Sequence, residues 1–127
     1  MRVFLVRHAE AAPGEPDELR PLTDAGRAAA RALGERLAEV HPDAVVTSPH
    51  LRARETGEAI ARAAGLTAQP HDGLGFDATA GSLRAAVQGR GETVVAVGHQ
   101  PNCSEIVLAL TGREVRFAPA DVQELEL

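Results

Sequence analysis

Aromatic residues are scarce in this chain and lysine is absent. The 127 residues include three Phe, no Tyr and no Trp, so Ala, Val and Leu must fill the interior. Nucleic-acid surfaces that stack bases use aromatic platforms. The formal net charge of -5 also disfavours a general binder of nucleic acid or of anionic membranes. We therefore expect neither kind of partner, although one local positive pocket remains compatible with this composition.

Cysteine and long apolar runs are also in short supply. Cys103 has no partner for an internal disulfide and belongs to no metal-binding cysteine cluster, so we expect a small buried apolar residue there. The first apolar run is too short for a signal-peptide core, because it reaches Arg7 and His8 at once. No stretch approaches the length of a membrane span. The sequence predicts a cytoplasmic protein that needs no metal or cofactor.

Apolar runs alternate with helical patterns, which predicts one α/β domain over residues 1–127. The predicted strands cover residues 2–7, 44–47, 67–69 and 93–98, with a last strand within 115–127. The predicted helices cover residues 24–40, 49–64, 82–88 and 101–110. Ser48 is the expected N-cap of the second helix, with Pro49 as its first residue. This order predicts a three-layer sandwich in which helices flank a largely parallel central sheet.

Two of the predicted strands end in a histidine. One runs into Arg7 and His8, and another runs into Gly98 and His99. In open α/β sheets, ligands gather beyond the carboxyl ends of the strands. Parallel strands of one sheet would therefore bring both imidazoles and Arg7 to one crevice. Histidine beside arginine indicates phosphate chemistry more than metal chemistry.

A third strand end supports an anion site. Ser48 and Pro49 start a helix directly after a strand, and helix N-termini favour anions through unpaired N–H groups. Arg52 adds a planar, permanently charged fork that suits phosphate oxygens. Gly98 permits close approach of the backbone, and another helix opens after His99. Together these features predict a phosphate site.

These motifs resemble those of the histidine phosphatase superfamily, also called the phosphoglycerate mutase-like fold. The similar segments are Arg7-His8 followed by a small residue, Ser48-Pro49-x-x-Arg52-Ala53-x-x-Thr56, and Gly98-His99. The stretch Arg20-Pro21-Leu22-Thr23, followed by Gly26, resembles the segment before the first helix in SixA-type phosphohistidine phosphatases. That compact branch also matches in length, so the resemblance covers essentially the whole chain.

The resemblance implies that His8 is the nucleophile and forms a phosphohistidine intermediate. It also implies that Arg7, Arg52 and His99 bind the transferring phosphoryl group, with Arg20 assisting. An imidazole is nucleophilic only when neutral, and its ordinary pKa is about 6.5. Neighbouring guanidinium groups help to keep His8 deprotonated, while an incoming dianion draws His99 toward its protonated form.

Several site residues are less firmly indicated. Ala9 stands where the family usually has glycine. Asp77, in a glycine-rich loop, is the leading candidate for a general acid and Glu10 is the second; each is equally well explained as a solvated loop carboxylate. Gln100, directly after His99, is a candidate for substrate binding. His50 and His71 are expected to border the entrance.

The preferred function is a metal-independent phosphatase that acts on phosphohistidine in a partner protein. A phosphoimidazole protonated on its other nitrogen leaves as neutral imidazole, so it needs less acid catalysis than an ester does. The alternatives are a phosphomonoesterase of the same superfamily for small phosphorylated metabolites, and a catalytically silent phosphate- or phosphoprotein-binding module. A metal hydrolase using His8, His99 and Asp77 is disfavoured, because Arg7 and Arg52 would repel a divalent cation.

Overall fold

A five-stranded sheet with strand order β3-β2-β4-β1-β5 forms the centre of the molecule. The computed structural model describes all 127 residues. The strands are β1 (Arg2–Arg7), β2 (Ala44–Thr47), β3 (Ala68–Pro70), β4 (Thr93–Gly98) and β5 (Val122–Glu126). β5 pairs antiparallel with β1, and all other neighbours are parallel. The sheet is therefore largely parallel, as predicted.

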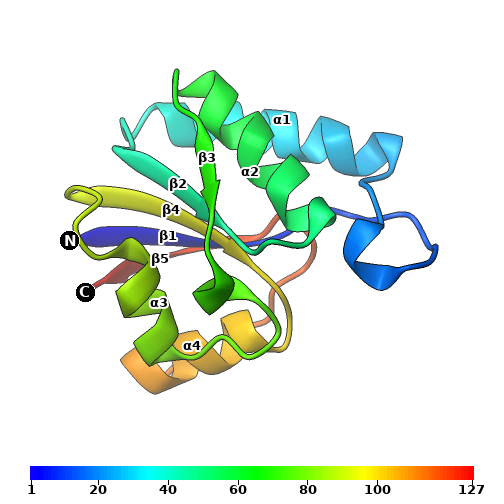
Figure 1. The fold of residues 1–127 in the computed structure, drawn as a ribbon. Helices are drawn as coiled ribbons and strands as arrows, with labels where there is room; N and C mark the ends of the chain where they lie inside the picture. The colour runs from blue at the N-terminus through cyan, green and yellow to red at the C-terminus, as the bar shows by residue number, and fades with distance from the viewer.

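Helices cover both faces of this sheet. They are α1 (Asp24–Ala38), α2 (Leu51–Ala63), α3 (Ala80–Val87) and α4 (Asn102–Thr111), with the short 3-10 helices η1 (Asp17–Leu19) and η2 (Asp72–Leu74). Figure 1 shows α1 and α2 on one face of the sheet and α3 and α4 on the other. The predicted three-layer α/β architecture is confirmed. None of the helices combines the length and the apolar character needed to cross a membrane.

The side chains of β1 divide between two apolar cores. Val3 and Leu5 pack in the core that contains residues of α3 and α4, whereas Phe4 and Val6 pack in the core that contains residues of α1 and α2. Successive side chains of a strand point to opposite faces. Because helices cover both faces, every position from Val3 to Val6 is apolar and buried.

The start of α2 differs from the prediction. The helix begins at Leu51 with His50 as its N-cap, so the assignment of Ser48 as N-cap and Pro49 as first helical residue was wrong. The Ser48 hydroxyl oxygen lies 2.7 Å from Nε2 of His99 and accepts the N–H of His50 at 3.2 Å. Ser48 therefore stabilises the bend between β2 and α2 instead of the helix end.

Smaller differences occur at other boundaries. α1 ends at Ala38, short of the predicted residue 40, because the N–H of Glu39 turns back to the carbonyl of Arg36. α3 begins at Ala80, before the predicted residue 82, because Thr79 and Ser82 form a reciprocal capping box. These ends are set by local hydrogen bonds that the apolar pattern does not reveal.

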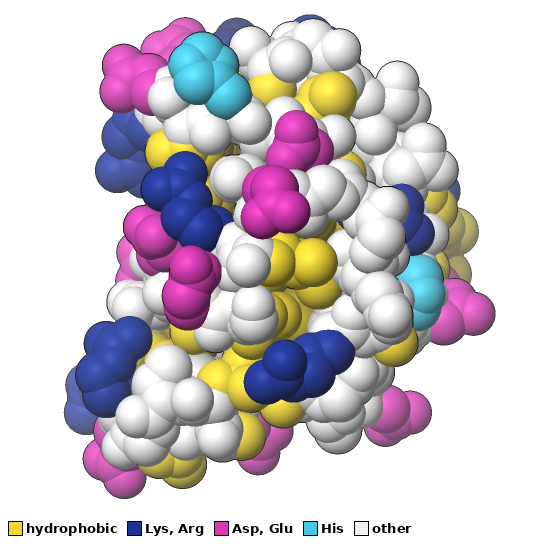
Figure 2. All heavy atoms as spheres, turned by 90° about the vertical axis from the view of Figure 1, so that its left-hand side faces the viewer, with side chains coloured by type: hydrophobic (Ala, Val, Ile, Leu, Met, Phe, Trp, Pro, Cys, Tyr) yellow, Lys and Arg dark blue, Asp and Glu magenta, His cyan; other side chains and the backbone are white.

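The edge at which the parallel strands begin carries charges of both signs around an apolar stripe (Figure 2). A hollow of about 280 Å³ near the two chain ends is lined by Met1, Val87 and Leu127, with Arg84 and Gln88 beside them. The carboxyl ends of the parallel strands lie on the opposite side of the molecule. The sequence predicts the functional site at these carboxyl ends.

Candidate active site

The register between β1 and β4 sets two histidines side by side. Arg7 pairs with Gly98 at the last position of the ladder, and the N–H of His8 donates to the Gly98 carbonyl at 3.0 Å. The next residue of each strand, His8 and His99, therefore leaves the sheet at the same edge. Their ring centroids lie 5.3 Å apart. The two strand ends meet as the sequence predicted.

The ring of His8 is held in one tautomer. Its Nδ1 lies 2.8 Å from the carbonyl oxygen of Ala9. A carbonyl oxygen only accepts hydrogen bonds, so the proton belongs on Nδ1 and the lone pair on Nε2. Burial lowers the pKa of His8 to about 4, aided by the charges of Arg52 and Arg7 and opposed by the Ala9 hydrogen bond. His8 is therefore a neutral imidazole near pH 7.

Thr56 fixes the turn that follows His8. Its hydroxyl oxygen accepts the N–H of Ala9 at 3.0 Å, and its hydroxyl group donates to the Arg52 carbonyl at 2.8 Å. Thr56 and Ala9 are both fully buried. Ala9 does not have a positive φ, so this turn does not require the glycine usual in the family. The motif threonine thus ties the end of β1 to the first turn of α2.

A carboxylate bridges two arginines beside the histidines. Arg52 is buried and donates from Nη1 to the Asp17 carbonyl at 2.8 Å, while its Nη2 lies 3.1 Å from the Asp17 carboxylate. Arg20 donates to the other carboxylate oxygen at 3.0 Å. These hydrogen bonds, first from Arg20 and then from Arg52, lower the pKa of Asp17. Sequence reasoning missed Asp17, and only its place shortly before Arg20 in a polar loop hinted at it.

Arg7 contributes a guanidinium group from the end of β1. Its Nη1 donates to the carbonyl of Phe117 at 2.9 Å, whereas its Nε is buried and has no hydrogen-bond partner. Buried donors in folded proteins nearly always have a partner. Arg7 therefore keeps one donor, its Nε, that no group of the protein accepts.

His99 lies deeper than His8. It is 1% exposed, and burial, followed by the charges of His8 and Arg52, lowers its pKa to about 3. Its Nε2 is bonded to the Ser48 hydroxyl, while its Nδ1 is buried without a partner. In the free protein His99 is therefore neutral, with one ring nitrogen still available.

Two further rings pack against His99. The His50 and Phe76 centroids lie 4.9 Å and 4.6 Å from the His99 centroid, and 4.4 Å from each other. The Phe76 ring also lies 5.5 Å from Cζ of Arg52. His50 was expected near the entrance and does lie in the site. Phe76 was missed, although it is the only aromatic residue in a glycine-rich loop.

The remaining candidates, Asp77, Glu10 and Gln100, make no side-chain hydrogen bond to these residues. Asp77 is exposed and makes no side-chain hydrogen bond. The Glu10 carboxylate accepts the Thr23 hydroxyl at 2.7 Å, at the start of α1. Gln100 bonds through both ends of its amide to Ser104, at 2.8 and 2.9 Å. The roles predicted for Asp77, Glu10 and Gln100 stay predictions.

Another predicted neighbour of the entrance, His71, has a local structural contact. Its Nδ1 accepts the N–H of Gly73 at 2.9 Å and caps η2. No group of three or more His, Cys, Asp or Glu side chains is arranged to hold a metal ion. The assembled donors are instead imidazoles and the guanidinium groups of Arg7, Arg20 and Arg52. Such donors suit a tetrahedral oxyanion.

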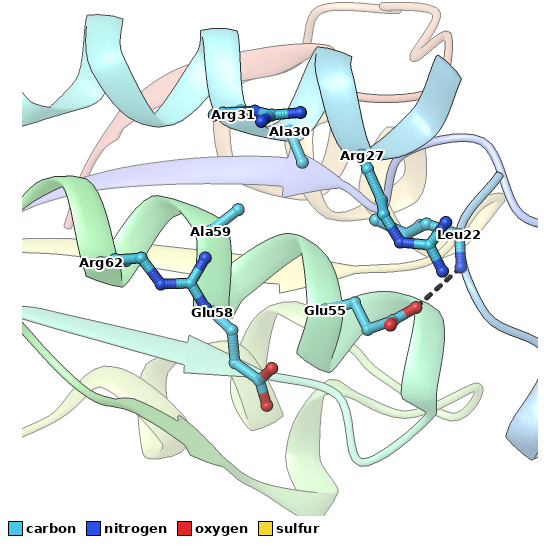
Figure 3. Close-up of a pocket in the computed structure, with 8 residues that line it drawn as sticks. All are labelled: Leu22, Arg27, Ala30, Arg31, Glu55, Glu58, Ala59 and Arg62. Carbon is cyan, nitrogen blue, oxygen red and sulfur yellow. Dashed lines mark hydrogen bonds between the residues drawn. The ribbon is translucent and has the colours of Figure 1, made fainter. Parts of the chain in front are cut away.

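A separate hollow of about 270 Å³ lies between α1 and α2, and Figure 3 shows its charged walls. It is lined by Leu22, Arg27, Ala30, Arg31, Glu55, Glu58, Ala59 and Arg62. Neither His8 nor His99 lines it. The Glu55 carboxylate accepts the N–H of Leu22 at 2.7 Å, the dashed line in Figure 3. Glu55 thereby holds the segment after Arg20 against α2. This contact helps to fix the position of Arg20.

Comparison with known proteins gives the same assignment as the motifs. The model of the histidine phosphatase superfamily (branch 1) matches residues 3–75. An uncharacterized protein of Picosynechococcus sp. is 32% identical, over 96% of this chain and 82% of its own length.

Solved structures match over nearly the full length. The protein histidine phosphatase SixA complexed with tungstate is 27% identical with a TM-score of 0.87, covering 100% of this chain and 88% of the other. The putative phosphohistidine phosphatase SixA from Agrobacterium tumefaciens is 29% identical with a TM-score of 0.82, over 98% and 90%. A phosphoglycerate mutase from Bacillus anthracis, 14% identical with a TM-score of 0.77 over 98% and 86%, shares the fold. The chain belongs to the histidine phosphatase superfamily and is a phosphatase of the SixA type.

Proposed function

We propose that this phosphatase removes phosphate from phosphohistidine in a partner protein, through a phosphohistidine intermediate at His8. The observation that carries the proposal is the neutral His8 ring, whose Nε2 is free while Ala9 holds its Nδ1. The likeness to a protein histidine phosphatase SixA over the whole chain supports the choice of substrate. That structure is complexed with tungstate, which is a tetrahedral oxyanion as phosphate is.

In the first half-reaction, Nε2 of His8 attacks phosphorus. A bond forms between Nε2 and phosphorus while the bond from phosphorus to the substrate imidazole breaks, and the electron pair leaves with that imidazole. With its other nitrogen already protonated, the substrate ring departs as neutral imidazole. Arg7, Arg20 and Arg52 offset the charge on the phosphoryl oxygens. In this step Arg20 and Arg52 give up their hydrogen bonds to the Asp17 carboxylate and donate to the phosphoryl oxygens instead.

In the second half-reaction, water attacks the phosphorus of phospho-His8. A phosphorus–oxygen bond forms, the bond to Nε2 breaks, and His8 recovers its electron pair as a neutral ring that keeps its proton on Nδ1. The product is dihydrogen phosphate. Both half-reactions expel a neutral imidazole, so neither requires a carboxylic acid as proton donor. This symmetry is consistent with the positions of Asp77 and Glu10, which make no hydrogen bond to His8.

His99 assists through its protonation state. It is neutral in the free protein because burial and nearby positive groups lower its pKa. A bound phosphoryl dianion reverses this balance and favours the protonated ring. The buried Nδ1, which lacks a partner, then has a phosphoryl oxygen to donate to. Protonated His99 thereby adds to the stabilisation that Arg52 gives to the negative charge on the phosphoryl oxygens.

A substrate panel tests the proposal. Wild type, His8→Ala and the control His41→Asn are compared on a histidine-phosphorylated protein and on sugar phosphates. His41 is an exposed turn residue with a φ of 51°, a conformation that Asn tolerates. We expect wild type and His41→Asn to prefer the phosphoprotein by tenfold or more, on the order of 1.4 kcal/mol, and His8→Ala to be inactive. A strong preference for sugar phosphates would instead identify a small-molecule phosphomonoesterase.

Chemical trapping tests the intermediate separately. Rapid quenching of wild type with radiolabelled substrate should leave a label on His8 that is lost in acid and kept in base. Turnover should be unchanged in excess chelator. Tight phosphate binding without label or turnover would indicate a binding module instead, and loss of turnover in chelator would indicate a metal hydrolase.

A further inference from the structure

Phe76 differs from the other aromatic residues of this chain in its exposure. The sequence has three Phe and neither Tyr nor Trp. Phe4 and Phe117 are 7% and 4% exposed and belong to the cores, whereas Phe76 is 50% exposed. The exposed apolar surface of Phe76 would gain free energy if a bound ring covered it. The Phe76 ring also lies beside the site residues His50 and His99.

One part of the Phe76 ring contacts the site itself. Its centroid lies 4.6 Å from that of His99 and 4.4 Å from that of His50, and Cζ of Arg52 is 5.5 Å away. The rings meet at tilted angles of 51° and 57°, a common arrangement of aromatic pairs. Phe76 therefore contacts His50, His99 and Arg52 while half of its surface stays exposed to solvent.

The backbone around Phe76 is held firmly. Residues 75–78 form a turn in which the N–H of Ala78 donates to the Gly75 carbonyl at 3.1 Å. The side-chain amide of Asn102 donates to the carbonyls of Phe76 and Ala78, at 2.8 and 3.1 Å. Asn102 is itself only 8% exposed. These hydrogen bonds order the turn that carries the Phe76 ring. Phe76 therefore loses less conformational entropy when a second ring packs on it.

We infer that Phe76, with His50 beside it, binds the ring of the leaving group and makes the site selective for phosphate carried on a planar aromatic group. Imidazole is such a group, so this inference rests on the proposed function and explains how a phosphohistidine ring is held. Aromatic pairs gain from offset or edge contacts, and an aliphatic leaving group has no ring to make them. Phe76 acts here as a specificity-determining residue.

Two pairs of substrates isolate the contribution of the ring. Phosphohistidine and phosphoramidate both contain a phosphorus–nitrogen bond, but only the first has a ring; phenyl phosphate and ethyl phosphate form the matching phosphorus–oxygen pair. For each pair, kcat/KM for the substrate with a ring is divided by kcat/KM for the substrate without one. The ratio of each variant is then compared with the wild-type ratio, so the intrinsic reactivity of the bonds cancels. The variants are Phe76→Leu, which removes the ring, and Phe76→Tyr, which keeps it. Leu108→Ala, at an exposed apolar residue of α4, is the control.

We expect Phe76→Leu to lower both ratios by about three- to tenfold, the range that one aromatic pair supplies. Phe76→Tyr and Leu108→Ala should keep the ratios within about twofold of wild type. Equal losses on both members of each pair in Phe76→Leu would overturn the inference, because they would show that Phe76 only supports His99. A wild type that hydrolyses the phenyl and ethyl esters but not phosphohistidine contradicts the proposed function, and the ester ratio still decides the role of Phe76.

Discussion

Single hydrogen bonds decide the chemical state of the atoms in this site. The Ala9 carbonyl selects the tautomer of His8, and the Ala9 N–H is in turn held by Thr56. The Ser48 hydroxyl occupies Nε2 of His99. Each of these bonds involves a residue of the family motifs around His8, Ser48 and His99. The motif residues therefore fix the orientation of the two histidine rings as well as supplying charge to the site.

Replacing Thr56 tests whether the turn after His8 depends on its hydroxyl. Thr56→Val keeps the shape but leaves the Ala9 N–H and the Arg52 carbonyl without this partner. We expect a loss of about 1–3 kcal/mol in the free energy of unfolding, measured in urea, and a fall in kcat of about tenfold, on the order of 1.4 kcal/mol in barrier height. Thr56→Ser is the control, since it keeps the hydroxyl. Full activity in Thr56→Val would contradict this view of the turn.

The thiol of Cys103 should be inert in the folded protein. It is 1% exposed, and burial raises its pKa to about 12, although the Arg7 charge acts in the opposite direction. The thiolate is the reactive form, so we expect no reaction with a thiol reagent at pH 8 until denaturant is added. Reaction of the native protein at the rate of the unfolded chain would disprove this, with mass spectrometry locating the modification.

Secondary-structure elements position the site through register and close approach. The parallel register of β1 with β4 brings His8 to His99, and the first turn of α2 carries Arg52 to Asp17. α1 approaches the segment after β1 so closely that Gly26 lies against the Glu10 carbonyl. The position of these elements therefore depends on small residues where the backbones meet.

A pair of glycine substitutions measures this close approach. In Gly26→Ala the new Cβ would overlap the Glu10 carbonyl oxygen, and we expect a loss of about 1–3 kcal/mol in stability. Gly81→Ala is the matched control in the first turn of α3, where the nearest atom to a new Cβ lies 3.7 Å away. It should stabilise by about 0.5–1 kcal/mol, because alanine favours the helix. Both values come from urea unfolding, and equal effects of the two changes would refute the close-approach argument.

The folded protein keeps two histidines uncharged, the half-buried His8 and the buried His99, and this links its stability to pH. The pKa values of His8 and His99 are about 4 and about 3 in the folded protein, below the ordinary value of about 6.5 that applies to the unfolded chain. As the pH falls below about 6.5, the unfolded chain therefore binds protons before the folded protein does. The stabilisation from neutral histidines is complete above that pH and is lost as the pH falls toward 4 and then 3.

Comparison with a variant isolates this effect. The free energy of unfolding is measured between pH 7.5 and pH 4 for wild type and for His8→Gln, which cannot take up the proton. Carboxylates titrate in both proteins, so their contribution largely cancels in the difference. We expect wild type to lose more stability than His8→Gln between about pH 6.5 and pH 4. Parallel curves would mean that folding does not change the His8 pKa.

The strands could be predicted from sequence because their signals are local. The apolar runs at β1 and β4 needed no knowledge of distant residues, and both predicted ranges match the observed ones. Helix ends were less predictable: Ser48 resembles an N-cap, yet its hydroxyl is used by His99, which lies far along the chain. Local patterns cannot reveal such competition.

The amino-acid sequence by itself determined the three layers and the residue types that meet at the carboxyl ends of the strands, because periodicity and strand-ending motifs are encoded over a few neighbouring residues. Only the tertiary structure decided that Asp17 bridges two arginines and that Phe76 packs against His99. These contacts join separate loops. Their geometry arises when the sheet and helices bring the loops together, so no local pattern in the chain records it.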